Sequence, residues 1–155
     1  MSREGEVTEY CPRCGAGIRT WQRPGVSVDM LITYEGRLVL VYRRNRPVAW
    51  ALPGGYVDYG EALEHAARRE ALEETNLELE GAEQFHTYSD PDRDDRQHSI
   101  TTVFLARGVG ELRAGDDAER VALFDPADAP HPLAFDHSRI VRDFARYLET
   151  GERPR

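Results

Sequence analysis

The chain has 155 residues, enough for one domain with a substantial hydrophobic core and no need for disulfides. Hydrophobic residues make up 40% of it and charged residues 31%, and no apolar run approaches the roughly 18 residues that span a bilayer. A formal net charge of −8 argues against a broad nucleic-acid surface, which needs a basic patch. The first residues have no apolar core typical of a secretory signal, so we expect a cytoplasmic protein without a membrane or nucleic-acid partner.

Residues 1–25 precede the first strong strand pattern, and we expect them to form an irregular arm. This arm holds both cysteines of the chain, Cys11 and Cys14, at the spacing of half a zinc knuckle. A structural Zn²⁺ needs four ligands, so a single chain would supply half a site and a dimer the other half. The sequence alone favours the other explanation, which is a cysteine pair that binds no metal.

Residues 26–150 carry the patterns of a mixed α/β domain. Apolar runs predict strands over 26–34, 38–42, 50–52, 79–87, 100–106 and 121–124. Runs of helix-forming residues predict helices over 61–75 and 137–148, and Asn76 suits the left-handed end of the first helix. Residues 151–155 are expected to fray. Strands combined with one central and one final helix predict a sheet that is covered on both faces.

The helix expected over 61–75 has acidic side chains on its apolar face. At about 100° per residue, that face gathers Leu63, Ala66, Ala67 and Ala71, and it must point at the protein body. Glu70 and Glu74 fall in the middle of this face, and Glu73 lies at its edge. The opposite side holds Glu64, Arg68 and Thr75.

Three neighbouring carboxylates on a buried face are unfavourable, because desolvation and mutual repulsion both disfavour their charge. A divalent cation removes this cost, and Mg²⁺ prefers carboxylate oxygens while keeping waters for substrate phosphates. Arg69 can reach Glu73 at i+4 and orient it. Glu61 either joins this site or only interacts with the helix dipole, and both explanations stay open. The glycine pair Gly54–Gly55 leaves backbone carbonyls free to approach a metal.

The segment Gly55–Leu77, GYVDYGEALEHAARREALEETNL, resembles the Nudix box G-x5-E-x7-R-E-U-x-E-E-x-G-U, in which U is a bulky aliphatic residue. Ala71 replaces one aliphatic residue and Asn76 the last glycine. The resemblance implies a Nudix-type α/β/α sandwich with a mixed sheet and a loop–helix–loop metal platform. It also implies Mg²⁺ or Mn²⁺ bound by Gly55, Glu70, Glu73 and Glu74.

The resemblance further implies hydrolysis of a diphosphate linkage by an activated water, without a covalent intermediate. Arg69 would then assist catalysis by orienting a carboxylate. The family often places its water-activating carboxylate in a late acidic loop, here residues 116–119. Glu119 is our candidate for the general base, with Glu74 as its rival and an ordinary surface charge as the opposing explanation for Glu119.

The loop Tyr88–His98, YSDPDRDDRQH, resembles the segment YSDPxRDPRGH of small ADP-ribose pyrophosphatases. This likeness implies hydrolysis of ADP-ribose to AMP and ribose 5-phosphate, although a solvated turn also explains the composition of the loop. Arg93 or Arg96 would hold a phosphate or the terminal ribose. Further candidates for substrate contacts are Arg43 and Arg44 after a strand, and Trp50, for which core packing is the stronger explanation.

Three alternatives stay open at this point. The first is a pyrophosphohydrolase for nucleoside triphosphates such as oxidised dGTP. The second is an NADH pyrophosphatase-like enzyme, which the Cys11–Cys14 pair suggests but the lack of a four-cysteine ribbon disfavours. The third is a nucleotide-sensing domain without catalysis, which the intact box carboxylates disfavour. Relatives in the resembled subgroup are often homodimers, so a homodimer is a further expectation.

Overall fold

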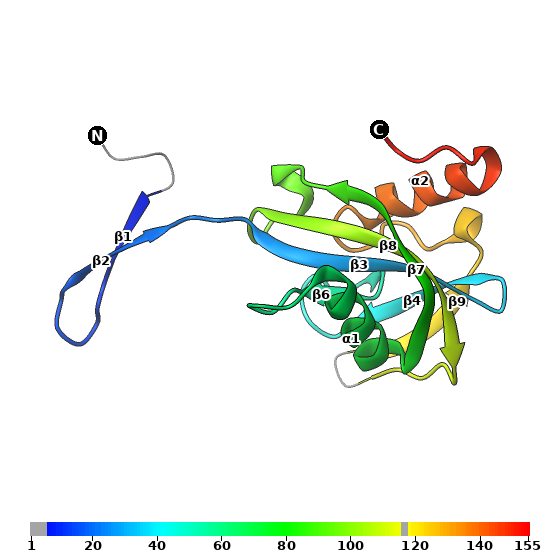
Figure 1. Cartoon of the computed structure of the whole chain (residues 1–155), viewed down its shortest axis with the longest axis horizontal. Helices are drawn as coiled ribbons and strands as arrows, with labels where there is room; N and C mark the ends of the chain where they lie inside the picture. The colour runs from blue at the N-terminus through cyan, green and yellow to red at the C-terminus, as the bar shows by residue number, and fades with distance from the viewer. Residues whose placement is uncertain (1–5, 116–117) are drawn as a thin grey trace.

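A mixed β-sheet forms the centre of the body in a computed structural model that describes residues 6–115 and 118–155 (Figure 1). Its strands are β3 (Gly25–Tyr34), β4 (Arg37–Arg43), β5 (Trp50–Ala51), β6 (Gly54–Tyr56), β7 (Leu77–Tyr88), β8 (Ser99–Gly110) and β9 (Ala118–Phe124). The helices are α1 (Leu63–Thr75) and α2 (His137–Thr150), with short 3₁₀ turns η1 (Pro91–Arg93) and η2 (Pro126–Asp128).

The strand order β5-β4-β3-β8-β7 places β3 at the centre, where it runs parallel to β8. All other pairings are antiparallel among the residues described, including β6 on β3 and β9 on β4. β3 pairs with β6 over Ser27–Asp29 but with β4 only at Thr33 and Tyr34. The first half of β3 is therefore not paired with β4. It is paired with β6 instead, and α1 is the next element of the chain after β6.

The two helices cover opposite faces of the sheet. Ala66, Ala67 and Ala71 of α1 share a core with Met30 and Ile32 of β3. The residue between these two, Leu31, faces the other way and packs with α2, which contributes Ile140, Val141 and Phe144. This alternation follows from the two-residue period of a strand. Each large apolar side chain buried in this way stabilises the fold by about 1.5–3 kcal/mol, and the predicted α/β/α sandwich is confirmed.

At the two ends of α1 the structure can be compared directly with the prediction from the sequence. Ala62 is the N-cap and makes no side-chain capping bond, so the helix begins at Leu63 rather than at Glu61. At the other end Asn76 has a left-handed φ of 59°, as predicted, and its N–H bonds the Leu72 carbonyl. Thr75 is fully buried, which corrects its placement on the solvent side. Its hydroxyl donates back to the Ala71 carbonyl at 2.6 Å, which removes the cost of burying it.

The arm before residue 25 is not irregular over its described part. It forms a hairpin of β1 (Glu6–Tyr10) and β2 (Gly17–Trp21), which make a two-stranded sheet of their own. In Figure 1 this hairpin stands clear of the body and is joined to it only by the chain leading into β3. Short runs of mixed polarity such as GIRTW lack the apolar alternation that identified the other strands, so the sequence pattern missed the hairpin.

The remaining differences lie at element ends. The short strand β6 and both 3₁₀ turns were not predicted, and β7, β8 and β9 are longer than expected. After α2 the last residues have no regular secondary structure, but Arg153 pairs with Glu83 at 2.7 Å. Among the described residues, no helix has the length and apolar character needed to cross a membrane.

Candidate active site

Gly54 and Gly55 bring the backbone of β6 against two carboxylates. In the register of β6 on β3, Gly54 lies opposite Asp29 and Gly55 opposite Val28. A Cβ at Gly54 would lie 2.3 Å from the Val28 carbonyl oxygen and 2.5 Å from Asp29 Oδ1. A Cβ at Gly55 would lie 2.4 Å from Glu70 Oε1. The missing side chains therefore let carboxylate oxygens touch the backbone at the point where β6 meets α1.

Glu74 and Glu70 occupy the inward side of α1, as the helical wheel predicted. Glu74 Oε2 accepts a 2.9 Å hydrogen bond from the Gly54 N–H. Burial, assisted by the charges of Glu70 and Asp29, raises the pKa of Glu74 to about 8 against the opposing effects of that hydrogen bond and of Arg43. Burial also raises the pKa of Glu70, while Arg69 opposes the shift. Both carboxylates thus lie where a negative charge needs compensation.

Arg69 connects the carboxylates at the edge of this face. Its guanidinium forms two bonds with Glu61, of 2.9 and 2.8 Å, and one of 2.6 Å with Glu70 Oε1. The expected contact with Glu73 is present but longer, at 3.4 Å. The bonds from Arg69 hold the pKa of Glu61 down to about 2. Glu61 thus anchors Arg69, which in turn orients Glu70, and Glu61 is not the N-cap of the helix.

The donor set fits a hard divalent cation in its chemistry. Glu70 and Glu74 are partly buried carboxylates with raised pKa values beside a bare backbone, and Glu73 is exposed next to them. Over residues 6–115 and 118–155, however, no three His, Cys, Asp or Glu side chains stand together as a ready-made metal cage. Glu70 instead turns to Arg69, and Glu74 turns to the Gly54 amide.

A buried polar network lies behind the glycine pair, and sequence patterns did not reveal it. Asp29 accepts a 2.6 Å bond from the Thr101 hydroxyl, and its other oxygen lies 3.4 Å from His137 Nε2. The Leu52 N–H donates to His137 Nδ1 at 3.0 Å, which leaves the ring proton on Nε2 facing Asp29. Although burial alone would raise it, His137, Thr101 and Arg93 hold the pKa of Asp29 below its usual range.

Arg93 completes this network, and all three of its guanidinium nitrogens donate hydrogen bonds within it. It binds both oxygens of Asp136, at 3.2 and 2.7 Å, and its third nitrogen donates to the Ser99 hydroxyl at 2.9 Å. Its side chain is only 4% exposed. The sequence offered Arg93 as a substrate contact, and Arg93 does line the cavity that holds Arg43 and Arg96. Its guanidinium is nevertheless already bonded on all three nitrogens, and these bonds fix the start of α2 against β3 and β8.

Arg43 and Arg96 line a cavity of about 160 Å³ that also includes Gly54 and Gly55 in its wall. Each guanidinium lies 4.8 Å from the ring centroid of Phe135, so the two cations share one aromatic ring. Phe135 has a left-handed φ of 54°, which is rare for a bulky residue. Arg96 is also held by both oxygens of Asp94, and its side chain remains 41% exposed. The cavity therefore gathers positive charge beside the Gly54–Gly55 backbone, against which Glu74 and Glu70 also lie.

Three other candidate residues lie outside this cavity. Arg44 is exposed and does not line the cavity. Trp50 packs edge-on against Tyr42 and Phe124, in line with core packing rather than an open base-stacking position. Glu119 is exposed on β9, next to Ala118, which pairs with Arg43. Asp116 and Asp117 lie outside the described residues.

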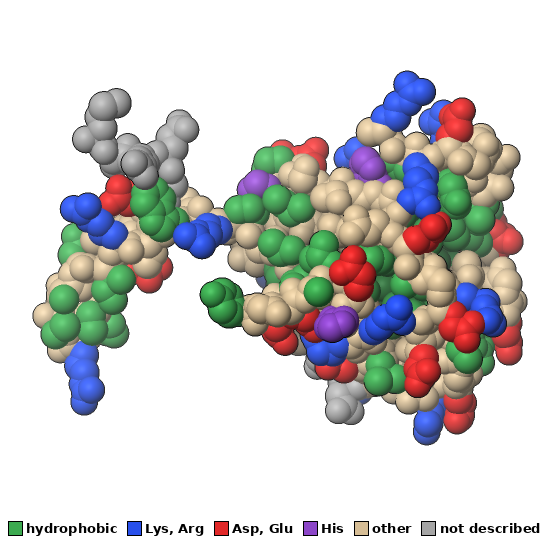
Figure 2. All heavy atoms as spheres, in the orientation of Figure 1, with side chains coloured by type: hydrophobic (Ala, Val, Ile, Leu, Met, Phe, Trp, Pro, Cys, Tyr) green, Lys and Arg blue, Asp and Glu red, His purple; other side chains and the backbone are tan. Residues whose placement is uncertain are grey.

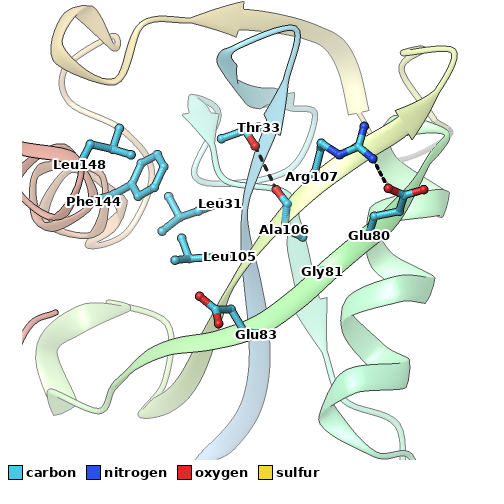
Figure 3. A pocket seen from close by; sticks show the side chains of 10 residues that line it. All are labelled: Leu31, Thr33, Glu80, Gly81, Glu83, Leu105, Ala106, Arg107, Phe144 and Leu148. Atoms are coloured by element: carbon cyan, nitrogen blue, oxygen red, sulfur yellow. Dashed lines mark hydrogen bonds and ion pairs between the residues drawn. The ribbon is translucent and has the colours of Figure 1, made fainter. Parts of the chain in front are cut away.

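A larger cavity, of about 420 Å³, lies between α2 and the β7–β8 edge (Figure 3). Apolar side chains dominate its wall, among them Leu31, Leu105, Phe144 and Leu148. Its charged groups are Glu83 and the pair Arg107–Glu80. It offers no cluster of carboxylates and no buried cation, so size alone does not make it the catalytic site.

Comparisons with known proteins agree with this geometry. The sequence profile described as "NUDIX domain" matches residues 22–144. The chain is 42% identical over 132 residues to an ADP-ribose pyrophosphatase of Methanocaldococcus jannaschii, covering 83% of this chain and 78% of that protein. It is 31% identical over 117 residues to a putative 8-oxo-dGTP diphosphatase of Bacillus subtilis, covering 74% and 76%.

The fold is similar to that of solved structures as well. The NUDIX domain of Shewanella oneidensis NrtR, solved in complex with ADP ribose, superimposes with a TM-score of 0.75. The two sequences are 27% identical, and the match covers 90% of this chain and 94% of that domain.

Proposed function

Because the chain belongs to the NUDIX family and is a pyrophosphohydrolase, we propose that it hydrolyses ADP-ribose to AMP and ribose 5-phosphate with the help of Mg²⁺ or Mn²⁺. The observation that carries the substrate proposal is the 42% identity to an ADP-ribose pyrophosphatase over most of both chains. The site supports it, because arginines line a cavity beside the Gly54–Gly55 backbone and the carboxylates of Glu70 and Glu74 lie against the same backbone, and a diphosphate bound with a cation needs both kinds of group.

The residues that would hold the cation are Glu70, Glu73 and Glu74, with the carbonyl of Gly55. When bound, the metal would neutralise the diphosphate and make a water more acidic. Arg69 would hold Glu70 in place through its 2.6 Å contact. Because Glu70 and Glu74 now contact Arg69 and Gly54, we expect small side-chain rotations on binding rather than a change of the backbone.

Arg43 and Arg96 would bind the phosphates from the other side of the cavity. Their guanidinium groups are fixed on Phe135, so little conformational freedom is lost when an anion binds. Water then attacks one phosphorus, the bond to the bridging oxygen breaks, and a carboxylate accepts the water proton. We propose Glu74 for this base over its rival Glu119, because Glu74 accepts a hydrogen bond from the Gly54 N–H in the wall of the cavity. Arg93 would position this site through Asp136 and Asp29.

The second candidate is a nucleoside triphosphate pyrophosphohydrolase. The similarity to a putative 8-oxo-dGTP diphosphatase supports it, although at lower identity. The same carboxylates and arginines would serve a triphosphate, so the distinction rests on the nucleoside and on the group beyond the second phosphate.

One experiment separates these candidates. The full chain with Mg²⁺ is offered ADP-ribose, NADH, diadenosine polyphosphates, and normal and oxidised nucleoside triphosphates, and the products are separated. We expect AMP and ribose 5-phosphate from ADP-ribose at the highest kcat/KM. Pyrophosphate from a triphosphate, with ADP-ribose left intact, would overturn the substrate proposal. Binding of ADP-ribose with no hydrolysis of any compound would instead indicate a nucleotide-sensing domain.

A further inference from the structure

The turn that joins β1 and β2 has the geometry of a metal-binding knuckle. The Gly15 N–H donates to the Cys11 carbonyl at 2.8 Å, and the Cys11 N–H donates to the Ala16 carbonyl at 2.9 Å. Gly15 has a left-handed φ of +71°, which turns the chain back into β2. These two hydrogen bonds and this φ close a tight turn that contains both Cys11 and Cys14.

Both cysteines belong to this one turn between β1 and β2. Both cysteines are free thiols, with Cys14 exposed and Cys11 partly so. Two thiols two residues apart in one tight turn form half of a tetrahedral sulfur site, which is the preferred environment of Zn²⁺.

Two further ligands are needed to complete such a site. Among the residues that the structure describes, no third His, Cys, Asp or Glu joins the two sulfurs. The turn lies at the end of the hairpin away from the body, as Figure 1 shows, so a second turn can approach it without a clash between the bodies. We propose that the Cys11–Cys14 turns of two copies of this chain together bind one Zn²⁺ ion, which makes the protein a zinc-linked homodimer.

The surface of the hairpin supports a second copy as the partner. Tyr10 is 71% exposed, Ile18 53% and Trp21 44%, and Figure 2 shows hydrophobic side chains gathered on the hairpin. In the strand register Tyr10 lies opposite Gly17 and Trp21 opposite Glu6, so the two aromatic residues share one face. An isolated two-stranded hairpin is marginally stable in water. Pairing two hairpins around a zinc ion would stabilise both and cover their apolar side chains.

The proposal is independent of the substrate, because Cys11 and Cys14 take no part in the catalytic site. Metal-free, reduced full-length chain is titrated with Zn²⁺ or with Co²⁺ as a coloured substitute, while its molar mass is followed by light scattering. We expect one metal ion per two chains, a cobalt–sulfur charge-transfer band, and conversion of monomer to dimer. Since metal binding and pairing are coupled, a chelator should reverse both changes.

Matched variants locate the site. Cys11→Ser and Cys14→Ser should each abolish metal-dependent dimerisation. Gly15→Ala should weaken zinc binding by straining the turn, whereas Gly36→Ala, with a similar φ of +74° in the turn between β3 and β4, should not. The proposal is overturned if no metal binds to the reduced thiols, if one ion binds per monomer, or if Cys11→Ser still dimerises with zinc.

Discussion

The carboxylate side and the arginine side of the active site were built in different ways. On α1 the acidic groups lie within five residues of one another, and the helical period alone places Glu70 and Glu74 inward. Across the cavity, Arg93 and Arg96 come from one loop but have opposite environments. Both line the cavity, but Arg93 is buried on Asp136, 43 positions away in the chain, whereas Arg96 pairs with nearby Asp94 and is partly exposed. The sequence therefore predicted the inward carboxylates, which are close together in the chain. It did not predict the Arg93–Asp136 pair, whose members are far apart in the chain.

The largest effect is expected on the carboxylate side. Glu74→Gln and Glu73→Gln should each lower kcat by roughly 10²–10⁴-fold, because a cation ligand or proton acceptor is lost. The fold should remain, since neutralising Glu74 removes a partly buried charge. Glu64→Gln, on the exposed side of the same helix, is the matched control and should keep full activity. Full activity in both Glu73→Gln and Glu74→Gln would contradict the proposed metal site.

Arg93 should instead be important for stability. Arg93→Ala leaves the buried carboxylates of Asp136 and Asp29 without a cation, which should lower the free energy of unfolding by about 3–5 kcal/mol. The control is Arg107→Ala, which breaks the exposed pair with Glu80 and should cost about 1 kcal/mol or less. Denaturant titration measures both. Equal losses in the two variants would show that Arg93 is not the structural residue described above.

Arg96 should act on substrate binding. Arg96→Ala removes one charged donor from the cavity and should raise KM about tenfold with a smaller change in kcat, because one charge-assisted hydrogen bond is worth ~1.5 kcal/mol or more. Unfolding is measured in parallel, since Asp94 loses its partner. Arg44→Ala serves as the comparison, because Arg44 is exposed and does not line the cavity. Equal effects on KM would mean that the cavity is not the phosphate site.

The smallest expected effect is on the stability of α1 and leaves the proposed catalytic residues unchanged. Ala62 is an N-cap without a capping side chain, so Ala62→Ser should stabilise the protein by about 1 kcal/mol. Hydrolysis should be unchanged, since Ala62 is exposed and is not among the proposed metal ligands. Thermal unfolding and steady-state rates check the two halves of this expectation. A change in rate without a change in stability would mean that α1 shifts relative to the glycine pair.

The difference between contacts that are near and far in the chain also explains which parts of the fold could be predicted from the sequence. Strands β3, β4, β7 and β8 and both helices were found because their apolar periods are strong and local. Asp29, Thr101 and His137 were not found as a network, because nothing in their spacing shows that β3, β8 and α2 bring them together. Thr75 was misplaced because a wheel describes a helix in isolation and not the loop that covers its last turn, where the Gly115 N–H bonds the Glu74 carbonyl.

The central claim is that Glu70 and Glu74 bind a catalytic cation beside the bare backbone of Gly55, and Gly55→Ala tests it most directly. The new Cβ would lie 2.4 Å from Glu70 Oε1, at the end of a flexible side chain, so the fold can adapt but the carboxylate must move. Mn²⁺ binding, followed by the electron paramagnetic resonance of the free ion, should weaken at least tenfold, and ADP-ribose hydrolysis should fall with it. Unchanged Mn²⁺ binding and hydrolysis in Gly55→Ala would contradict the account.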